Sequence, residues 1–196
     1  MELKSIYKSF GDKKAVENFS LSINAGEIIC LMGESGVGKT TLINIILGLI
    51  KPDSGEIIDP FKKISCVFQE DRLLDGFSAL DNLRFVLGDS ISEEQLIKEC
   101  RKLNLSLQDI NQDVATLSGG QRRRVAILRA LLYPHDLLLL DEAFKGIDEN
   151  NRNTAIEYIK DKSKTILIIT HDAEVCRLFS ARKATMRSAN SPLSNL

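Results

Sequence analysis

Apolar runs rich in β-branched residues recur along the chain and alternate with segments whose apolar residues follow a helical spacing. The apolar runs predict buried strands over residues 28–32, 64–68, 137–140 and 165–170. The helical spacing predicts helices over residues 40–50, 121–132 and 151–160. Because strands that alternate with helices form largely parallel sheets, the pattern predicts an α/β fold with a mostly parallel core sheet.

Two segments depart from this alternation. Residues 3–24 consist of short alternating stretches broken by turn residues, and they predict a small antiparallel β layer at the N-terminal side. Residues 78–113 show helical spacing without a convincing strand, so they predict a helical insert in which Ser92 and Gln95 form a capping box.

These patterns also predict the domain organisation. We expect one domain over residues 1–180, with a helical subdomain inserted at about residues 78–120. Residues 181–196 mix basic and polar side chains with Ser and Asn, and they predict a flexible tail.

Composition excludes several classes of protein. The 196 residues carry 26 basic and 27 acidic side chains, so the net charge of -1 creates no general attraction to nucleic acid or anionic lipid. A charged N-terminus and the lack of any run near the roughly 20 apolar residues of a membrane span predict a soluble, cytoplasmic protein. The four cysteines are widely spaced without a CxxC pair, so we expect all of them to be reduced and structural.

A glycine-rich loop follows the first predicted core strand. Its sequence fits the phosphate-binding pattern GxxxxGKT, and it lies between a strand and an apolar helix, which disfavours the alternative of an ordinary turn. The glycines let backbone N–H groups face a phosphate, Lys39 would reach the β- and γ-phosphates, and Thr40 would ligate Mg²⁺. The predicted nucleotide-binding residues here are Gly33, Glu34, Ser35, Gly36, Val37, Gly38, Lys39, Thr40 and Thr41.

Two carboxylates end the third predicted core strand. Asp141 and Glu142 follow four leucines, which places them at the carboxyl end of a buried strand, where open α/β sheets bind ligands. Alone, such a pair is more often a solvated strand end or a helix cap. Beside a phosphate-binding loop it is typical of a Walker B element, in which Asp141 holds Mg²⁺ through water and Glu142 polarises the attacking water.

The sequence LSGGQ at residues 117–121 is the signature of ATP-binding cassette (ABC) ATPases, and the chain resembles this family over nearly its whole length. The resemblance implies the ABC form of the P-loop NTPase fold and the cofactors ATP and Mg²⁺. Four further positions match family motifs: the adenine-stacking aromatic Phe10, the Q-loop glutamine Gln69, the D-loop aspartate Asp148 and the switch histidine His171. For Phe10 the alternative is an aromatic side chain of the core.

The resemblance assigns roles to these residues. Glu142, His171 and Gln69 are expected to be catalytic, with His171 at the γ-phosphate. Thr40, Gln69 and, through water, Asp141 are the expected Mg²⁺ ligands. The chain is therefore expected to be an enzyme that hydrolyses ATP.

The signature implies a second subunit. In the family, the residues matching Ser118, Gly119, Gly120 and Gln121 cap the ATP held by the partner's phosphate loop, with help from the helix dipole. We therefore expect a dimer of cassettes, with a homodimer as the simpler case. Residues 122–124 are three arginines that could form a nucleic-acid patch, but the family commonly has basic residues here, so we expect no nucleic acid.

The branch of the family follows from the Q-loop. Residues 67–74 resemble those of importer cassettes for nitrate, sulfonate, taurine and related solutes, although Asp75 and Gly76 replace a frequent Pro-Trp pair. We therefore expect integral membrane permease subunits as partners, docked on residues 70–77, and an extracytoplasmic solute-binding protein. The cassette would lie on the inner face of the cell membrane through the permease. The alternative for residues 70–77 is a solvated loop.

One departure and two rival functions remain open at this point. Lys145 stands near the expected dimer seam, where the family usually has a small hydroxyl residue, and this puts the rate of hydrolysis in question. The first rival is an ABC ATPase outside transport, associated with DNA or ribosomes. The second is a regulatory module that binds ATP without turnover.

Overall fold

A parallel five-stranded sheet forms the centre of the computed structural model, which describes residues 1–186. Its strands, in the spatial order β5-β6-β7-β3-β8, are β3 (Ile28–Met32), β5 (Ile64–Val67), β6 (Leu137–Asp141), β7 (Ile166–Ile169) and β8 (Arg182–Thr185). The four core strands predicted from the sequence are confirmed as β3, β5, β6 and β7, and each neighbouring pair is parallel.

A second, antiparallel sheet lies at the N-terminal side, as predicted. Its strands, in the order β2-β1-β4, are β1 (Glu2–Phe10), β2 (Lys13–Ser22) and β4 (Ser54–Ile58). The sequence pattern did not identify β4, because this edge strand is short and three of its five residues are exposed.

The helices are α1 (Lys39–Ile46), α2 (Ala79–Leu87), α3 (Glu93–Lys102), α4 (Leu107–Asn111), α5 (Gly119–Leu132), α6 (Glu149–Lys162) and α7 (Ala173–Leu178). Helix α1 ends four residues before its predicted end, because Gly48 takes a left-handed conformation (φ 71°) and the Leu49 N–H turns back to the Asn44 carbonyl. No helix among residues 1–186 is both long and apolar enough to span a membrane.

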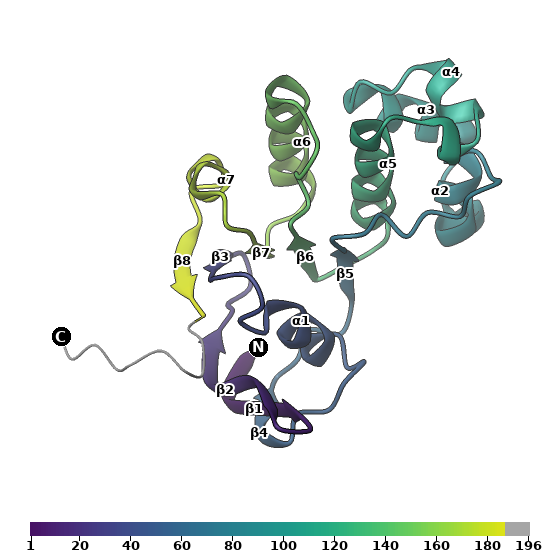
Figure 1. Cartoon of the computed structure of the whole chain (residues 1–196). Helices are drawn as coiled ribbons and strands as arrows, with labels where there is room; N and C mark the ends of the chain where they lie inside the picture. The colour runs from purple at the N-terminus through teal and green to yellow at the C-terminus, as the bar shows by residue number, and fades with distance from the viewer. Residues whose placement is uncertain (187–196) are drawn as a thin grey trace.

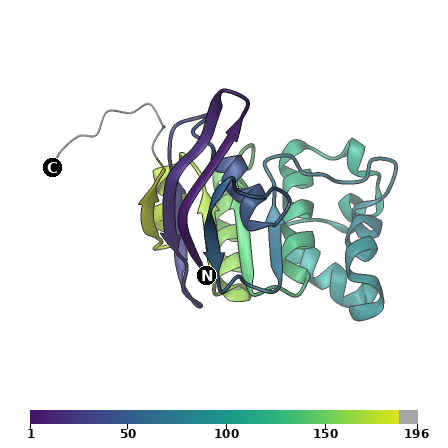
Figure 2. The same ribbon diagram turned by 90° about the horizontal axis from the view of Figure 1, so that it is seen from below.

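Helices α2, α3 and α4 form the predicted insert. They gather with α5 at one side of the molecule, away from the antiparallel sheet (Figures 1 and 2). The Ser92 hydroxyl accepts from the Gln95 N–H at 3.3 Å, which is one of the two bonds of the predicted capping box. Complete capping boxes form instead at Ser78, Ser106 and Ser118.

The parallel sheet separates two hydrophobic cores. Leu138 and Leu140 of β6 face one core, which contains the buried sides of α2, α3, α5 and α6. Leu137 and Leu139 face the other, which contains α1 and the antiparallel sheet. Because side chains alternate along a strand, strands buried on both faces require the continuous apolar runs seen in the sequence.

The predicted tail needs a correction. Residues 182–185 form β8, which pairs in parallel with β3, so the expectation of a flexible segment from residue 181 is wrong for this part. Arg182 and Lys183 are exposed, and a short polar edge strand carries no apolar run that periodicity could reveal. Residues 187–196 of the predicted tail lie outside the described residues.

Candidate functional site

The glycine-rich loop connects β3 to α1, as predicted, and its glycines have conformations that other residues rarely take. Gly36 and Gly38 have φ angles of 79° and 102°. A Cβ atom on Gly38 would lie 1.9 Å from the Ala15 carbonyl oxygen, so the hairpin of β1 and β2 packs directly against the loop. The loop is therefore fixed in shape by its own glycines and by β2.

Lys39 folds back over this loop. Its ammonium group donates hydrogen bonds to the carbonyl oxygens of Gly33 at 2.6 Å and Glu34 at 2.7 Å. The positive charge and the N-terminus of α1 therefore face the same space, and both favour an anion there.

A cavity of about 560 Å³ opens above the loop and collects most of the predicted site residues. It is lined by Lys13, Gly33, Glu34, Ser35, Gly36, Gly38, Lys39, Thr40, Thr41, Gln69, Asp141, Glu142, Lys145 and His171. The phosphate loop, both Walker B carboxylates, the Q-loop glutamine and the switch histidine thus meet in one place. Val37 does not line it, because its side chain is buried in the core beside α1.

Glu142 and His171 form a pair at the mouth of this cavity. The His171 Nδ1 atom lies 2.9 Å from a Glu142 carboxylate oxygen, and the Thr170 hydroxyl donates to the other oxygen at 3.3 Å. Glu142 has a left-handed backbone (φ 46°), and its N–H continues the sheet by donating to the Ile169 carbonyl. Residues from the ends of β6 and β7 therefore hold one carboxylate in a fixed orientation.

Asp141 lies deeper, at the end of β6, and is 3% exposed. Burial and, to a lesser degree, the negative charge of Glu142 raise the pKa of Asp141 to about 6, against the opposing effect of Lys39. A cation placed beside this buried carboxyl group would stabilise its ionised form. Oxygen donors from Thr40, Gln69 and Asp141 line the same cavity, and oxygen ligands of this kind fit Mg²⁺.

Phe10 is not part of the cavity lining. It is 51% exposed at the tip of the hairpin, where it pairs across the strands with Lys13. Lys13 does line the cavity, but it was not predicted, because a single lysine in a polar strand matches no motif. The core alternative for Phe10 is excluded by its exposure, and stacking on adenine remains a prediction.

The signature residues lie outside the cavity. Ser118 caps α5, where its hydroxyl accepts from the Gln121 N–H at 3.2 Å, and the Ser118 N–H donates to the Gln121 side-chain oxygen at 2.8 Å. Ser118 and Gly119 are exposed, and Gly120 packs against the backbone of Gly146. The start of α5 thus presents free space at a helix N-terminus, which is suited to an anion that its own chain does not supply.

A family model described as ABC transporter matches residues 16–145. The chain belongs to this family. The cassette is 40% identical to the spermidine/putrescine import ATP-binding protein PotA of Pseudomonas aeruginosa (strain UCBPP-PA14), over 95% of the cassette and 56% of that protein. It is 36% identical to the aliphatic sulfonates import ATP-binding protein SsuB 2 of Pseudomonas savastanoi pv. phaseolicola, over 93% of the cassette and 69% of that protein. The cassette therefore spans little more than half the length of its polyamine-import relatives.

Solved structures confirm the fold. The dimeric structure of MJ0796, a bacterial ABC transporter cassette, aligns with a TM-score of 0.83 and 30% identity over 95% of this chain and 94% of that one. A second dimeric structure of MJ0796, in a post-hydrolysis state bound to ADP and Pi, aligns with a TM-score of 0.82 and 29% identity, over 96% of each chain. The predicted P-loop NTPase fold of the ABC type is thus confirmed.

Arginines of α5 hold the Q-loop of this cassette. Arg123 is buried, donates to the Phe68 carbonyl at 2.6 Å and to the Gln69 carbonyl, and places its Nε 3.1 Å from an Asp71 carboxylate oxygen. Arg129 donates to the carbonyl of Asp71 at 2.8 Å. Arg122 bonds to Asp75 and to the Val114 carbonyl, and Arg124 bonds to the Leu103 carbonyl and to Asn151, so the side chains of residues 122–124 all bind protein groups. The sequence did not indicate Arg123 as a residue of the site.

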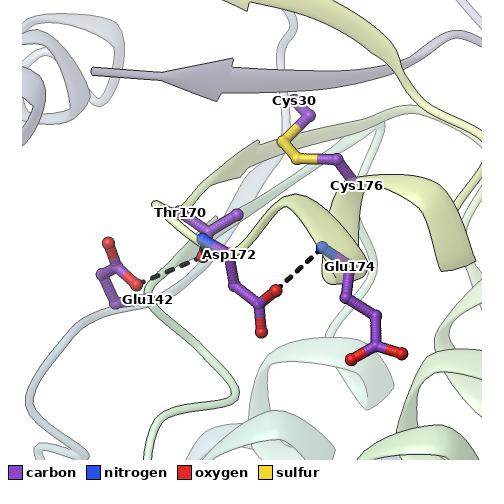
Figure 3. The surroundings of a disulfide bond; sticks show 6 residues. All are labelled: Cys30, Glu142, Thr170, Asp172, Glu174 and Cys176. Atoms are coloured by element: carbon purple, nitrogen blue, oxygen red, sulfur yellow. Dashed lines mark hydrogen bonds between the residues drawn. A yellow bond between two sulfur atoms is a disulfide. The ribbon is translucent and has the colours of Figure 1, made fainter. Parts of the chain in front are cut away.

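A disulfide joins Cys30 of β3 to Cys176 of α7, with Cα atoms 5.7 Å apart (Figure 3). The expectation of four reduced cysteines is therefore wrong for this pair, since 146 residues separate them and only the fold brings them together. Figure 3 shows the bond together with Thr170, whose hydroxyl donates to Glu142 and accepts from the Asp172 N–H. Cys66 and Cys100 are free, and burial raises the pKa of each thiol to about 12.

Proposed function

We propose that this cassette binds and hydrolyses ATP as one half of a dimer and thereby drives a membrane permease. The observation that carries the proposal is the single cavity in which the phosphate loop meets Gln69, Asp141, Glu142 and His171. A nucleotide-holding regulatory module without turnover has no need for an oriented carboxylate beside the phosphate loop.

The geometry supports a division of labour in hydrolysis. The backbone N–H groups of the loop and the Lys39 ammonium bind the β- and γ-phosphates. Glu142 accepts a hydrogen bond from the attacking water and polarises it, while His171 and Thr170 hold the carboxylate in position. His171, with a largely exposed side chain, is free to contact the γ-phosphate as well.

Mg²⁺ is the cofactor that fits this donor set. When bound, it neutralises charge on the β- and γ-phosphates as the phosphoryl group leaves. Thr40 contributes a hydroxyl oxygen, Gln69 an amide oxygen and Asp141 a carboxylate that acts through water. A single buried carboxylate with substrate phosphates and water is the usual environment of Mg²⁺ in such enzymes.

The exposed signature supports a shared site. Ser118, Gly119, Gly120 and Gln121 would close over the ATP held by the phosphate loop of a second cassette, and Asp148 would lie at the same seam. ATP then joins the two cassettes and its hydrolysis separates them, which makes dimerisation a ligand-driven switch. A homodimer requires no component beyond this chain.

An apolar groove supports the permease as partner. It has a volume of about 330 Å³ and lies between the end of α1, β5, α2 and α5. Its lining includes Leu49 and Val86, which are exposed, and Phe68, which directly precedes Gln69. A helix of a permease could bury these side chains and sense the Q-loop at the same time. We propose this groove, together with the exposed Leu74 and Phe77 of the predicted segment 70–77, as the docking surface.

The direction of transport is proposed from the relatives. Several of them are named as import ATP-binding proteins, for spermidine and putrescine, for aliphatic sulfonates or for xylose and arabinose. We propose import of a small solute, with a solute-binding protein outside the membrane and the cassette on its cytoplasmic face. The import relatives favour transport over a role at DNA or ribosomes.

Glu142→Gln tests the hydrolytic function. The amide keeps the shape of the side chain but cannot act as a base, so we expect steady-state ATP hydrolysis to fall at least about a hundredfold while ATP binding persists. Glu94→Gln is the matched control, because Glu94 is exposed on α3 and far in sequence from the site. Turnover by Glu142→Gln at the rate of the control would contradict the catalytic assignment.

A further inference from the structure

The D-loop and the signature helix meet at one side chain, Asn151 of α6. Its side-chain amide nitrogen donates to an Asp148 carboxylate oxygen at 2.7 Å, and its backbone N–H donates to the other oxygen at 3.0 Å. Its amide oxygen accepts from Arg124 of α5 at 3.0 Å and from the Asn104 amide, also at 3.0 Å. The D-loop, the signature helix and the turn after α3 are therefore joined through this residue.

The partners fix the orientation of Asn151. A carboxylate faces its nitrogen and two donors face its oxygen, so all three side-chain contacts are satisfied only by an amide. Leu or Ala at this position would remove the oxygen that both Arg124 and Asn104 use as an acceptor, and Asp would place a second negative charge against Asp148. The hydrogen-bonding pattern therefore requires an amide group, on a side chain of the length of Asn.

Arg124 carries the connection to the signature itself. It is buried, donates to the Leu103 carbonyl at 2.6 Å and donates through Nε to the Gly120 carbonyl at 3.2 Å. A Cβ on Gly120 would meet the Gly146 carbonyl oxygen at 3.2 Å, so the first turn of α5 already lies against the D-loop backbone. Asn151 thus adds a side-chain link between two segments whose backbones already lie against each other.

We propose that Asn151 is a positioning residue, which holds the D-loop and the signature as one rigid surface for the second cassette. The inference rests on the proposed function, because only a dimer uses both segments together. A surface that is already ordered loses less conformational entropy on association. Losing Asn151 should therefore weaken the ATP-bound dimer without changing how a single chain binds ATP, since Asn151 does not line the cavity.

The test uses the full chain in the Glu142→Gln background, where bound ATP is retained. The dimer dissociation constant in Mg-ATP is measured by sedimentation over a range of protein concentrations. The ATP affinity of the monomer is measured with a fluorescent ATP analogue at low protein concentration. We expect Asn151→Ala to weaken the dimer about tenfold and to leave the monomer's ATP affinity within about twofold. Asn150→Ala, which changes an exposed neighbour on the same helix, should alter neither.

A second variant isolates the D-loop contact. Asn151→Asp keeps an acceptor for Arg124 and Asn104 but turns a carboxylate toward Asp148, so it should also weaken the dimer while keeping the thermal stability of the control. The inference is overturned if either Asn151 variant dimerises as tightly as Asn150→Ala, or if the monomer's ATP affinity falls in parallel with the dimer's. If the Glu142→Gln chain itself does not dimerise in ATP, the shared-site function fails, and this inference fails with it.

Discussion

The phosphate-loop cavity and the signature surface differ in how complete they are within one chain. In the cavity, residues from the loop before α1 and from the ends of β5, β6 and β7 converge, and Glu142 already has its hydrogen-bond partners. At the signature, the start of α5 also has its local hydrogen bonds in place, in a complete capping box, but none of the residues 118–121 lines that cavity.

The difference shows how the work of catalysis is divided. In the proposed function, the cavity holds the groups that bind phosphate and activate water, and all of them come from one chain. The signature is a helix N-terminus outside that cavity, so its proposed role involves the ATP of a second cassette. Variants in the two regions should therefore fail in different ways.

The largest expected effects are those of Gly119→Asp and Lys39→Ala, and the two variants should differ in whether the monomer still binds ATP. Gly119 has open space around it, so a carboxylate there leaves the fold intact but repels the ATP of the second cassette. We expect Gly119→Asp to lower turnover about a hundredfold with unchanged ATP affinity of the monomer, whereas Lys39→Ala loses the ATP affinity itself. Asn153→Asp, on the exposed side of α6, is the charge control. Equal loss of monomer ATP affinity in the first two variants would remove the distinction.

Asp141→Asn tests whether burial in the cavity disfavours the ionised form of Asp141, through the free energy of unfolding at two pH values. Because the folded-state pKa of Asp141 is raised to about 6, ionisation of this group lowers the free energy of unfolding progressively from about pH 4 to pH 6. The full reduction persists at every pH above 6. Without Mg²⁺ and nucleotide, Asp141→Asn should raise the free energy of unfolding by roughly 2 kcal/mol at pH 8 and by almost nothing at pH 4. Urea denaturation at both pH values, with Asp12→Asn as control, measures this. A gain that is the same at both pH values would contradict the assigned cause.

Arg123→Gln tests whether α5 positions the catalytic Q-loop. The variant removes the guanidinium from the Phe68 and Gln69 carbonyls and from Asp71, so the loop should loosen. We expect kcat to fall about tenfold with little change in KM for ATP. Arg101→Gln, on the exposed side of α3, should have wild-type kinetics. A rise in KM at constant kcat would instead place Arg123 in ATP binding.

Phe10→Ala should have the smallest effect. If the exposed ring stacks on adenine, its loss should weaken ATP binding by several-fold and leave kcat nearly unchanged. Phe85→Ala is the control, because Phe85 is also an exposed phenylalanine and lies on α2, outside the cavity lining. Titration of both variants with ATP and with inorganic triphosphate separates a base contact from a general effect, since the loss of a stacking residue should weaken binding only of the ligand that has a base. Equal weakening of both ligands by Phe10→Ala would contradict the stacking role.

The sequence predicted the parts of the fold that local patterns encode. The continuous apolar runs of β6 and β7 identify strands buried on both faces, and the glycine-rich loop between a strand and a helix identifies the phosphate site. The two missed strands, β4 and β8, are short, largely exposed edge strands, so their pairing depends on neighbours that periodicity does not show.

The rest of the site depends on contacts between distant segments. Lys13 reaches the cavity only because the hairpin packs on Gly38, and Cys30 pairs with Cys176 across 146 residues. Arg123 and Asn151 match no motif that names their partners, and the structure alone shows what they bind. Motif spacing therefore predicts which residues line the cavity better than which residues hold them in place.

The shared site is tested most directly by the rate of ATP hydrolysis per subunit as a function of protein concentration, with sizing in Mg-ATP alongside. If two cassettes complete each site, the wild-type rate per subunit rises with concentration, and the Glu142→Gln chain, without turnover, accumulates as a dimer. A rate per subunit that stays constant from dilute to concentrated protein, with a monomer throughout, would contradict the shared site.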